Sequence, residues 1–249
     1  MHPILRTVDH RPWPLPQGPW IMTQTWNDLL FAHWPLPPEV LRQGVPAALD
    51  LDTFNGQGWI AVTPFHMTGV RPRGVPDIPG FAKFPELNVR TYVTCQGRAG
   101  VYFFSLDAAS LSAVLGARSF YRLPYFYSNM KVRVNEDVHY ECNRRVSPQA
   151  RFRARYRPVS AVRIREKGTL ENWLTERYCL YTASGEQVFR ADIHHVPWPL
   201  QDAEADIEVN TMARAAGFTL PDVAPLLHFS RQLQVLVWPL RRVRSGAVS

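Results

Sequence analysis

The segment FPELNVRTYV, residues 84–93, alternates polar side chains with apolar or small ones at the two-residue period of a β-strand. Its polar face carries Glu86, Asn88, Arg90 and Tyr92. Burying a carboxylate and a guanidinium without partners is costly, so this face either meets solvent or lines a cavity. The sequence alone leaves both arrangements open.

The residues that follow predict a hairpin and then a helix. A strand over 101–106 can pair with 85–94 through the turn QGRAG, whose two glycines suit a tight reversal. Asp107 is a natural N-cap for a helix over 108–118. Pro124 disfavours a helical conformation at Leu123, so we expect an extended corner that carries Tyr125.

The rest of the chain favours strands and turns over a helical bundle, because 22 prolines and 14 glycines are scattered among short apolar runs. Further strands are predicted from Trp59 onward and at 151–157, 158–165, 177–182, 187–196 and 234–238. Short helices are predicted at 25–34 behind a capping box, at 38–43, at 169–174 behind Thr169, and at 210–217 behind Asn210. These patterns indicate a mainly β (α+β) fold with a few short helices.

Length and composition favour a single domain over residues 1–249, with an extended arm at 1–24 and a flexible tail at 241–249. No window approaches the ~20 apolar residues of a membrane span. The amino terminus has charges and prolines where a signal peptide needs an apolar core. We therefore expect a cytoplasmic protein without a membrane partner, and the sequence leaves assembly into a homo-oligomer open.

Motifs for metals and cofactors do not emerge from the sequence. The three cysteines lack CxxC spacing, which argues against a disulfide framework or a zinc ribbon. His194 and His195 are adjacent on a predicted strand, so their rings point to opposite faces. No Walker loop, dinucleotide fingerprint or GxSxG elbow is present. We expect neither a metal nor a cofactor.

Several segments resemble the YqjF-like family of uncharacterised bacterial proteins. The likeness covers nearly the whole chain and is carried by FAHWPLP, LDTFNGQGWIAVTPF, PELNVRTYV, GVYFFSLDAAS, LTERYCLYT and HVPWPLQ. That family in turn resembles a distant branch of the acetoacetate decarboxylase superfamily. The resemblance implies the superfamily's fold, a mostly antiparallel, cone-shaped β-barrel around a small-molecule cavity.

The resemblance also implies a departure in chemistry. In those decarboxylases a strand glutamate precedes a Gly-Phe-Pro-Lys-Lys segment, whose first lysine forms a Schiff base with a keto acid. Glu86 matches the glutamate, whereas Tyr125, within RLPYF at 122–126, stands in the lysine segment. A phenol has no amine to condense with a ketone. We expect no Schiff-base decarboxylation, unless Lys83 or Lys131 reaches the cavity from elsewhere.

Two hypotheses fit a cavity of this kind, and the sequence does not decide whether the protein is an enzyme. The first is a binding site for a small organic acid or apolar ligand, with ligand-binding residues Glu86, Asn88, Arg90, Tyr125, Glu176 and Tyr178. The second is a lysine-independent lyase or isomerase-type enzyme on a small organic acid. In it Glu86 transfers a proton, Arg90 binds a carboxylate and Tyr125 donates a hydrogen bond. A structural alternative pairs Glu86 with Arg90.

A third hypothesis is nucleic-acid binding through RFRARYR at 151–157, in a chain of net charge +7. A strand there puts four arginines on one face and turns Phe152 and Tyr156 to the other, so bases would lack a stacking platform. The sequence therefore favours a solvated face paired with acidic neighbours over a nucleic-acid partner.

Overall fold

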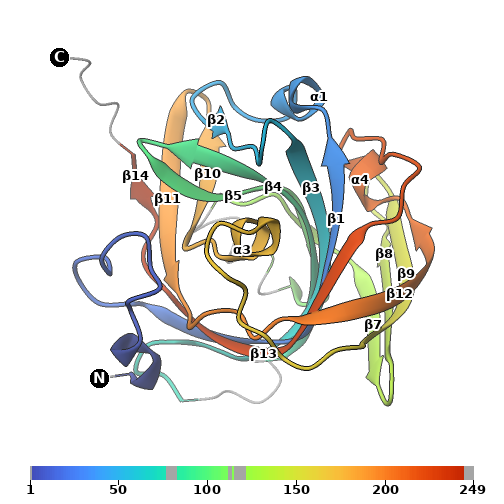
Figure 1. Cartoon of the computed structure of the whole chain (residues 1–249), viewed down its shortest axis with the longest axis horizontal. Helices are drawn as coiled ribbons and strands as arrows, with labels where there is room; N and C mark the ends of the chain where they lie inside the picture. Colours follow the sequence, from blue (N-terminus) through green and yellow to red (C-terminus); the bar gives the residue numbers. More distant parts are fainter. Residues whose placement is uncertain (1, 77–82, 112–113, 115–121, 244–249) are drawn as a thin grey trace.

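The computed structural model describes residues 2–76, 83–111, 114 and 122–243, and this part of the chain is built mainly of β-strands (Figure 1). Seven of the described strands pair in a closed circuit and so form a ring. In spatial order they are β11 (Gln187–His194), β10 (Cys179–Ser184), β5 (Arg98–Ala108), β4 (Phe84–Cys95), β3 (Gly58–Pro72), β1 (Met22–Leu36) and β13 (Leu226–Val237), which pairs back to β11. All of these pairings are antiparallel except that of β5 with β10. The mainly β fold class is confirmed.

Three short strands extend the ring at its edges. They are β2 (Asp50–Leu51) on β4, β6 (Tyr125–Tyr127) in parallel on β5, and β14 (Arg241–Arg242) on β11. The β6 pairing places the corner that carries Tyr125 beside Leu106 of β5. The first residues of the predicted tail therefore lie in a strand, and residues 244–249 fall outside the described residues.

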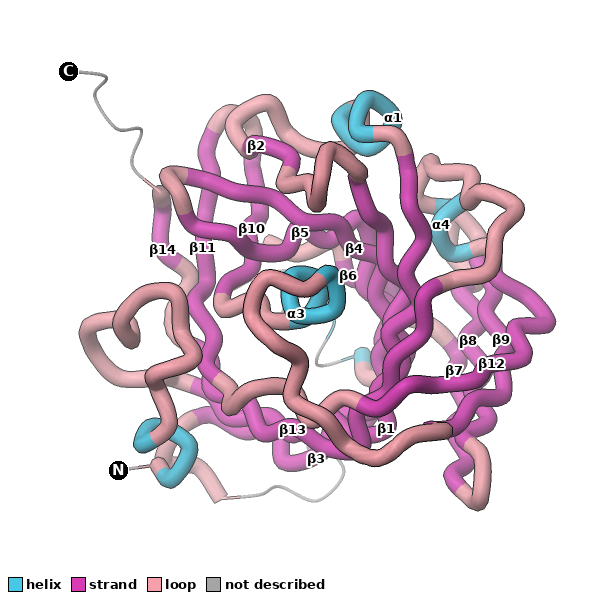
Figure 2. The backbone as a smooth tube through the Cα atoms, in the orientation of Figure 1, coloured by secondary structure: helices cyan, strands magenta, loops and turns pink. Residues whose placement is uncertain are grey.

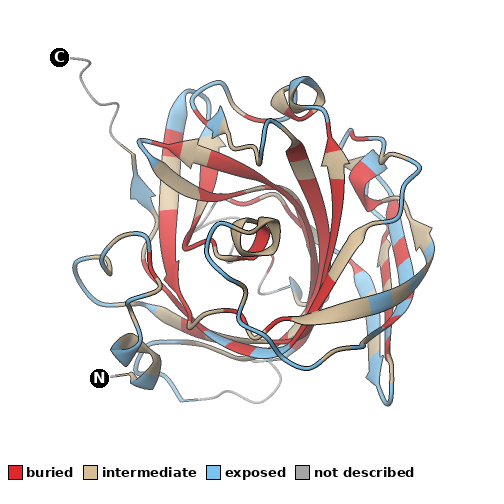
Figure 3. Cartoon of the chain, in the orientation of Figure 1, coloured by how far each residue is buried: buried red, intermediate tan, exposed pale blue. Residues whose placement is uncertain are grey.

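A second sheet continues from β13 and packs on the outside of the ring. Its strands, in order, are β12 (Gln201–Asn210), β9 (Ala150–Pro158), β8 (Val138–Arg144) and β7 (Asn129–Val134). Apolar side chains of β8 and β9 share a core with the outward-facing Leu30, Val62 and Val89 of the ring. Along β9 buried and exposed residues alternate, as predicted for 151–157 (Figure 3). The sheet thus covers one flank of the ring.

The predicted helix at 25–34 is wrong, because these residues lie in β1. The pairing of β1 with β3 shifts register between Asn27 and Ala32, and Asp28 adopts a φ of 47°. A bulge of this kind changes which face the following residues point to. Trp26 and Leu29 consequently both face the ring interior, three positions apart, and this spacing imitates that of a helix.

A second bulge corrects the prediction for Asp107, which lies in β5 and caps no helix. Val89 pairs with Ser105 but the next residue of β4 pairs with Phe103, so β5 carries an extra residue. Leu106 then turns inward and Asp107 turns outward, where Arg144 of β8 binds it. Most of the predicted helix at 108–118 falls outside the described residues.

The remaining short helices are close to their predicted places. They are α1 (Pro38–Arg42), α3 (Leu170–Thr175) and α4 (Met212–Ala215). Thr169 caps α3, since its hydroxyl accepts a hydrogen bond from the Asn172 amide at 3.3 Å. The predicted strand at 158–165 is wrong: beyond Pro158 the chain leaves the sheet and forms only an isolated bridge at Arg163.

The amino-terminal arm lies outside the ring (Figure 2). It contains the 3-10 helix η1 (Pro3–Arg6) and ends where β1 begins at Met22, three residues earlier than predicted. Arg11 of the arm donates hydrogen bonds to the Ile193 carbonyl at 2.9 Å and to Nδ1 of His194 at 3.1 Å. No helix in the described residues is long and apolar enough to cross a bilayer.

Candidate functional site

The ring encloses a cavity of about 650 Å³. Most of its wall is apolar, with side chains from several ring strands that include Trp26, Leu29, Phe65, Phe84, Phe103 and Leu106. Its chemically distinctive groups are Glu86, Asn88, Arg90, Tyr125, Arg177 and His195. Four of the six predicted site residues thus lie together in the cavity wall.

Strand β4 sets the order of the polar groups along the cavity. Glu86 lies opposite Phe65 of β3, and Arg90 lies opposite Ala61. Since β4 carries no extra residue between them, Glu86, Asn88 and Arg90 all face inward. Alternate residues of a strand are about 6.6 Å apart, so roughly 13 Å of strand separates the glutamate from the arginine.

Glu86 is only 3% exposed, and its Oε2 accepts a hydrogen bond from the Tyr125 hydroxyl at 2.7 Å. Burial raises the pKa of Glu86 to about 8, and the nearby charge of Asp107 adds to this, while the Tyr125 hydrogen bond opposes it. The carboxyl group is therefore largely protonated near pH 7. It contributes a neutral hydrogen-bonding group to the wall.

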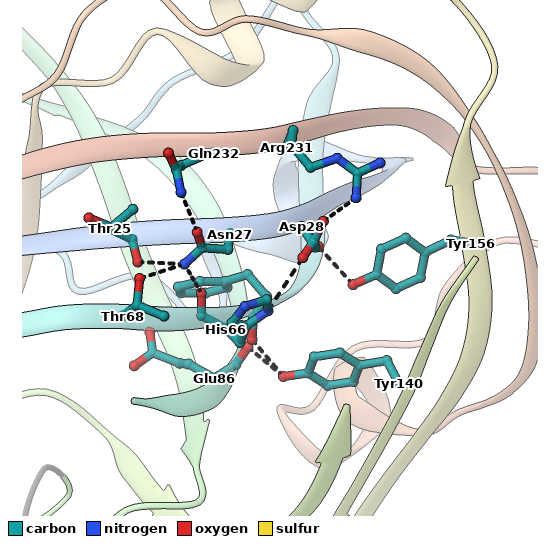
Figure 4. Close-up of polar contacts among 11 residues, drawn as sticks. Thr25, Asn27, Asp28, His66, Thr68, Glu86, Tyr140, Tyr156, Arg231 and Gln232 are labelled. Atoms are coloured by element: carbon teal, nitrogen blue, oxygen red, sulfur yellow. Dashed lines mark hydrogen bonds and ion pairs between the residues drawn. The ribbon is translucent and has the colours of Figure 1, made fainter. Parts of the chain in front are cut away.

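The backbone of Glu86 is held from the second sheet. The Tyr140 hydroxyl of β8 lies 2.7 Å from the Glu86 carbonyl oxygen and 3.0 Å from that of Phe65 (Figure 4). The same close-up shows Tyr156 of β9 donating to the Asp28 carbonyl oxygen, at 2.9 Å. Two phenols from the outer sheet therefore fix the strands whose other faces line the cavity.

Arg90 is buried in the wall, and its guanidinium carbon lies 5.3 Å from the centre of the Phe31 ring. No carboxylate of the described residues forms an ion pair with it, and the pairing with Glu86 considered from the sequence is not formed. Its Nε has no hydrogen-bond partner in the described part of the chain. Arg90 therefore brings an uncompensated positive charge to the cavity.

Arg177 is a cavity residue that the sequence analysis missed. Its Nη1 donates to Asp52 at 2.5 Å and its Nε to the Trp173 carbonyl oxygen at 2.7 Å. Its guanidinium carbon lies 4.8 Å from the centre of the Tyr92 ring, and that of Arg90 lies 6.0 Å from the same centre. The two arginines thus make one cationic end of the cavity.

Glu176 and Tyr178, the other two predicted site residues, do not line the cavity. The Tyr178 hydroxyl bonds to Glu176, and Oε1 of Glu176 accepts the Trp198 amide at 2.8 Å. The prediction assumed a strand from 177, but β10 begins at Cys179 and Glu176 lies at the end of α3. The chain turns there, and Arg177 faces inward in place of its neighbours.

His195 contributes an imidazole ring to the wall. Its Nδ1 lies 2.7 Å from the Val196 carbonyl oxygen, and its Nε2 lies 3.3 Å from that of Arg177. Burial lowers the pKa of His195 to about 4, so the ring is neutral at pH 7. Its neighbour His194 points the other way, toward the amino-terminal arm, and no group of three metal-binding side chains occurs in the described residues.

The three lysines of the chain all lie among the described residues, and all are exposed. Lys83, Lys131 and Lys167 are absent from the cavity wall. At the corner where the resemblance expects a lysine, the group inside the cavity is the Tyr125 hydroxyl.

The arginine face of β9 is paired with acidic groups of neighbouring strands. Arg153 meets Glu208 at 3.2 Å, and Arg157 meets Glu204 at 3.2 Å, both on β12. Arg155 lies 3.5 Å from Asp137. The cross-strand carboxylates neutralise much of the ladder that a phosphate backbone would need.

Comparison with known proteins places this geometry in a family. The family model DUF2071, described as an uncharacterized conserved protein, matches residues 23–234. The chain belongs to the DUF2071 family. This DUF2071 chain is 55% identical over 229 residues to the uncharacterized protein YqjF of Bacillus subtilis, a match that covers 92% of the chain and 95% of the relative. The resemblance found in the sequence is confirmed.

The fold of the DUF2071 chain is similar to the folds of several solved structures. The acetoacetate decarboxylase of Legionella pneumophila is similar with a TM-score of 0.59 and 15% identity, over 96% of this chain and 94% of that one. The enduracididine biosynthesis enzyme MppR, complexed with pyruvate, is similar with a TM-score of 0.61 and 9% identity, over 94% and 93% of the two chains. At identities this low, the structural similarity shows a shared fold and nothing further.

Proposed function

We propose that this DUF2071 protein binds a small organic acid inside the ring, with the ligand carboxylate between Arg90 and Arg177. The observation that carries the proposal is the cationic end of the cavity, where a buried arginine has no carboxylate partner among the described residues. A buried charge without a partner is costly, so a bound anion relieves that cost. The guanidinium fork also matches the geometry of a carboxylate.

The charge count at this end favours a monocarboxylate. Arg90 and Arg177 bring two positive charges, and Asp52 on Arg177 brings one negative charge, so two minus one leaves a single positive charge. His195 is neutral at pH 7 because its pKa is about 4, and Glu86 is largely protonated because its pKa is about 8. One anionic group on the ligand therefore neutralises the cavity.

The same site works without a Schiff base. Covalent catalysis on a ketone needs an amine within reach of the ligand, and the three lysines are exposed and outside the wall. The MppR structure in complex with pyruvate supports a small organic acid as ligand on a scaffold of this kind. This protein therefore differs from the decarboxylases in the chemistry that follows binding of the ligand.

Calorimetric titration with hexanoate and with the neutral hexanol tests the proposal. Hexanoate is expected to bind at least about tenfold more tightly, since hydrogen bonds to charged groups contribute about 1.5–3 kcal/mol. Arg90→Met is expected to remove this difference, whereas Arg157→Met, on the exposed face of β9, is expected to preserve it. Equal affinity of the unaltered protein for the acid and the alcohol would overturn the proposal.

The Glu86–Tyr125 contact favours a second candidate, a lysine-independent enzyme. A carboxyl group of pKa about 8, bonded to a phenol at 2.7 Å inside a cavity, can give and take a proton near neutral pH. Proton exchange at a carbon next to a carbonyl group is the simplest reaction of this type. Incubation of a keto acid in heavy water, followed by proton NMR, would detect deuterium uptake that depends on Glu86. Uptake that is unchanged in Glu86→Gln would rule this role out.

A further inference from the structure

We propose that the acid bound here is an amphiphile held head first: its carboxylate lies under α3 at the arginines, and an apolar chain of roughly eight carbons or more runs along β4 toward Met22 and Pro72. This inference rests on the proposed function and specifies its ligand class. Three features carry it, namely the closed arginine end, the apolar far end and the length of the cavity.

Helix α3 closes the arginine end. In Figure 1 it lies within the outline of the ring. Its Trp173 ring packs on the Tyr92 ring at 4.8 Å and on the Phe54 ring at 5.8 Å, and Thr175 at its end lines the cavity. Tyr92 is the next inward residue of β4 beyond Arg90. A carboxylate on Arg90 therefore lies against a lid of packed aromatic rings, and the rest of the ligand must extend the other way.

Strand register gives the path of the remaining ligand. Beyond Glu86, Phe84 of β4 lies opposite Met67 of β3. Further along, Met22 of β1 lies opposite Pro72 of β3. All four of these residues line the cavity, together with Val70. In this direction the wall is built mainly of hydrocarbon and thioether groups, which suit an apolar chain. The amide there, that of Gln24, is hydrogen-bonded to Trp26 and Met22 of the same strand.

Length and volume exclude a good fit for a very short acid. Arg90 lies six positions after Phe84 on β4, a distance of roughly 20 Å along the strand. A three-carbon acid at the arginines would leave most of the 650 Å³ without contacts, and the wall would forgo the dispersion energy of a filled cavity. The protonated Glu86 lets a neutral chain pass without placing a fixed negative charge beside it.

Titration with butanoate, hexanoate, octanoate and decanoate tests the inference directly. Each added methylene is expected to tighten binding about fourfold, because burying one contributes about 0.8 kcal/mol. The gain is expected to continue at least to octanoate. An affinity that is flat or falls from butanoate onward would overturn the inference and leave the proposed function intact.

A matched pair of variants tests where the hydrocarbon chain of the ligand lies. Met67→Trp narrows the far end opposite Phe84 and is expected to weaken hexadecanoate at least about tenfold while butanoate is unchanged. Val159→Trp, at an exposed position away from the cavity, is expected to change neither affinity. Undiminished hexadecanoate binding in Met67→Trp would contradict the head-first placement. If decanol binds as tightly as decanoate, the carboxylate site fails and the proposed function fails with it.

Discussion

Glu86 shows how a single buried group couples the cavity to pH. Its pKa rises from 4.5 in water to about 8 in the folded protein, because burial disfavours the charged form. The folded state therefore holds a proton that the unfolded chain releases above about pH 4.5. The stability that this proton contributes is complete below about pH 4.5 and is lost as the pH rises toward 8.

We expect the unfolding free energy of the unaltered protein to fall relative to that of Glu86→Gln by about 1.4 kcal/mol per pH unit within this window. The glutamine variant keeps a neutral side chain at all pH values, so the difference isolates Glu86. Urea unfolding of both proteins at several pH values from about 5 to about 8 measures it. A difference that does not change with pH would mean that Glu86 titrates as an exposed carboxylate does.

Arg144 and Asp107 form a buried ion pair behind the cavity wall. Nε of Arg144 donates to Asp107 at 2.7 Å, Nη2 donates to Ser105 at 3.0 Å, and both charged side chains are almost fully buried. Removing one partner leaves an unpaired buried charge. Arg144→Met is expected to destabilise the protein by about 3–5 kcal/mol.

The exposed pair of Arg157 and Glu204 is the control for that prediction. Surface ion pairs contribute little, so Arg157→Met is expected to change stability by less than about 1 kcal/mol. Chemical unfolding of both variants makes the comparison. Similar losses in the two variants would show that burial does not set the strength of these pairs.

The two-residue period of 84–93 was enough to predict that Glu86, Asn88 and Arg90 share a face, and the proline corner placed Tyr125. The period could not say that this face is internal, because the same alternation describes a solvated strand. Arg177 was not predicted as a cavity residue, because the direction of its side chain depends on where α3 ends and β10 begins. Element boundaries are set by tertiary contacts that a local pattern does not contain.

Two bulges explain where the element predictions went wrong. At Asp28 of β1 an extra residue shifts which side chains point inward, and the resulting spacing resembles that of a helix. Near Phe104 of β5 another extra residue turns Asp107, the predicted helix cap, outward. The hairpin of β4 and β5 was predicted correctly because the β5 bulge lies away from its turn. The alternating strand β9 was predicted correctly because nothing disturbs its two-residue period.

Gly100 lies where β5 passes close to the start of β10. A Cβ added at this glycine would lie 2.7 Å from the Cys179 carbonyl oxygen and 2.7 Å from the Tyr181 ring. Gly100→Ala is therefore expected to cost at least about 1–3 kcal/mol, because strand backbones would have to separate. Ala99→Ser, a half-buried change on the same strand, is expected to cost less than about 0.5 kcal/mol. Thermal unfolding that ranks the two variants in the opposite order would contradict this packing.

At the scale of the whole molecule, we propose that the ring and the outer sheet fold as one domain. Tyr140 and Tyr156 of the outer sheet bond to backbone carbonyls of β1, β3 and β4, and the two sheets share a core. Calorimetry is expected to show one unfolding transition, with equal calorimetric and van't Hoff enthalpies. Two separate transitions would assign the sheets to independent units.

The proposed function depends on a ligand carboxylate held between two arginines at the closed end of the ring. A crystal of the complex with a straight-chain acid of about twelve carbons that ends in bromine locates both ends of the ligand at once. We predict density for the carboxylate between Arg90 and Arg177, and an anomalous bromine peak in the apolar stretch near Phe84 and Met67. A bromine peak against Tyr92 and α3, with the carboxylate at the opposite end of the cavity, would contradict the proposed orientation of the ligand.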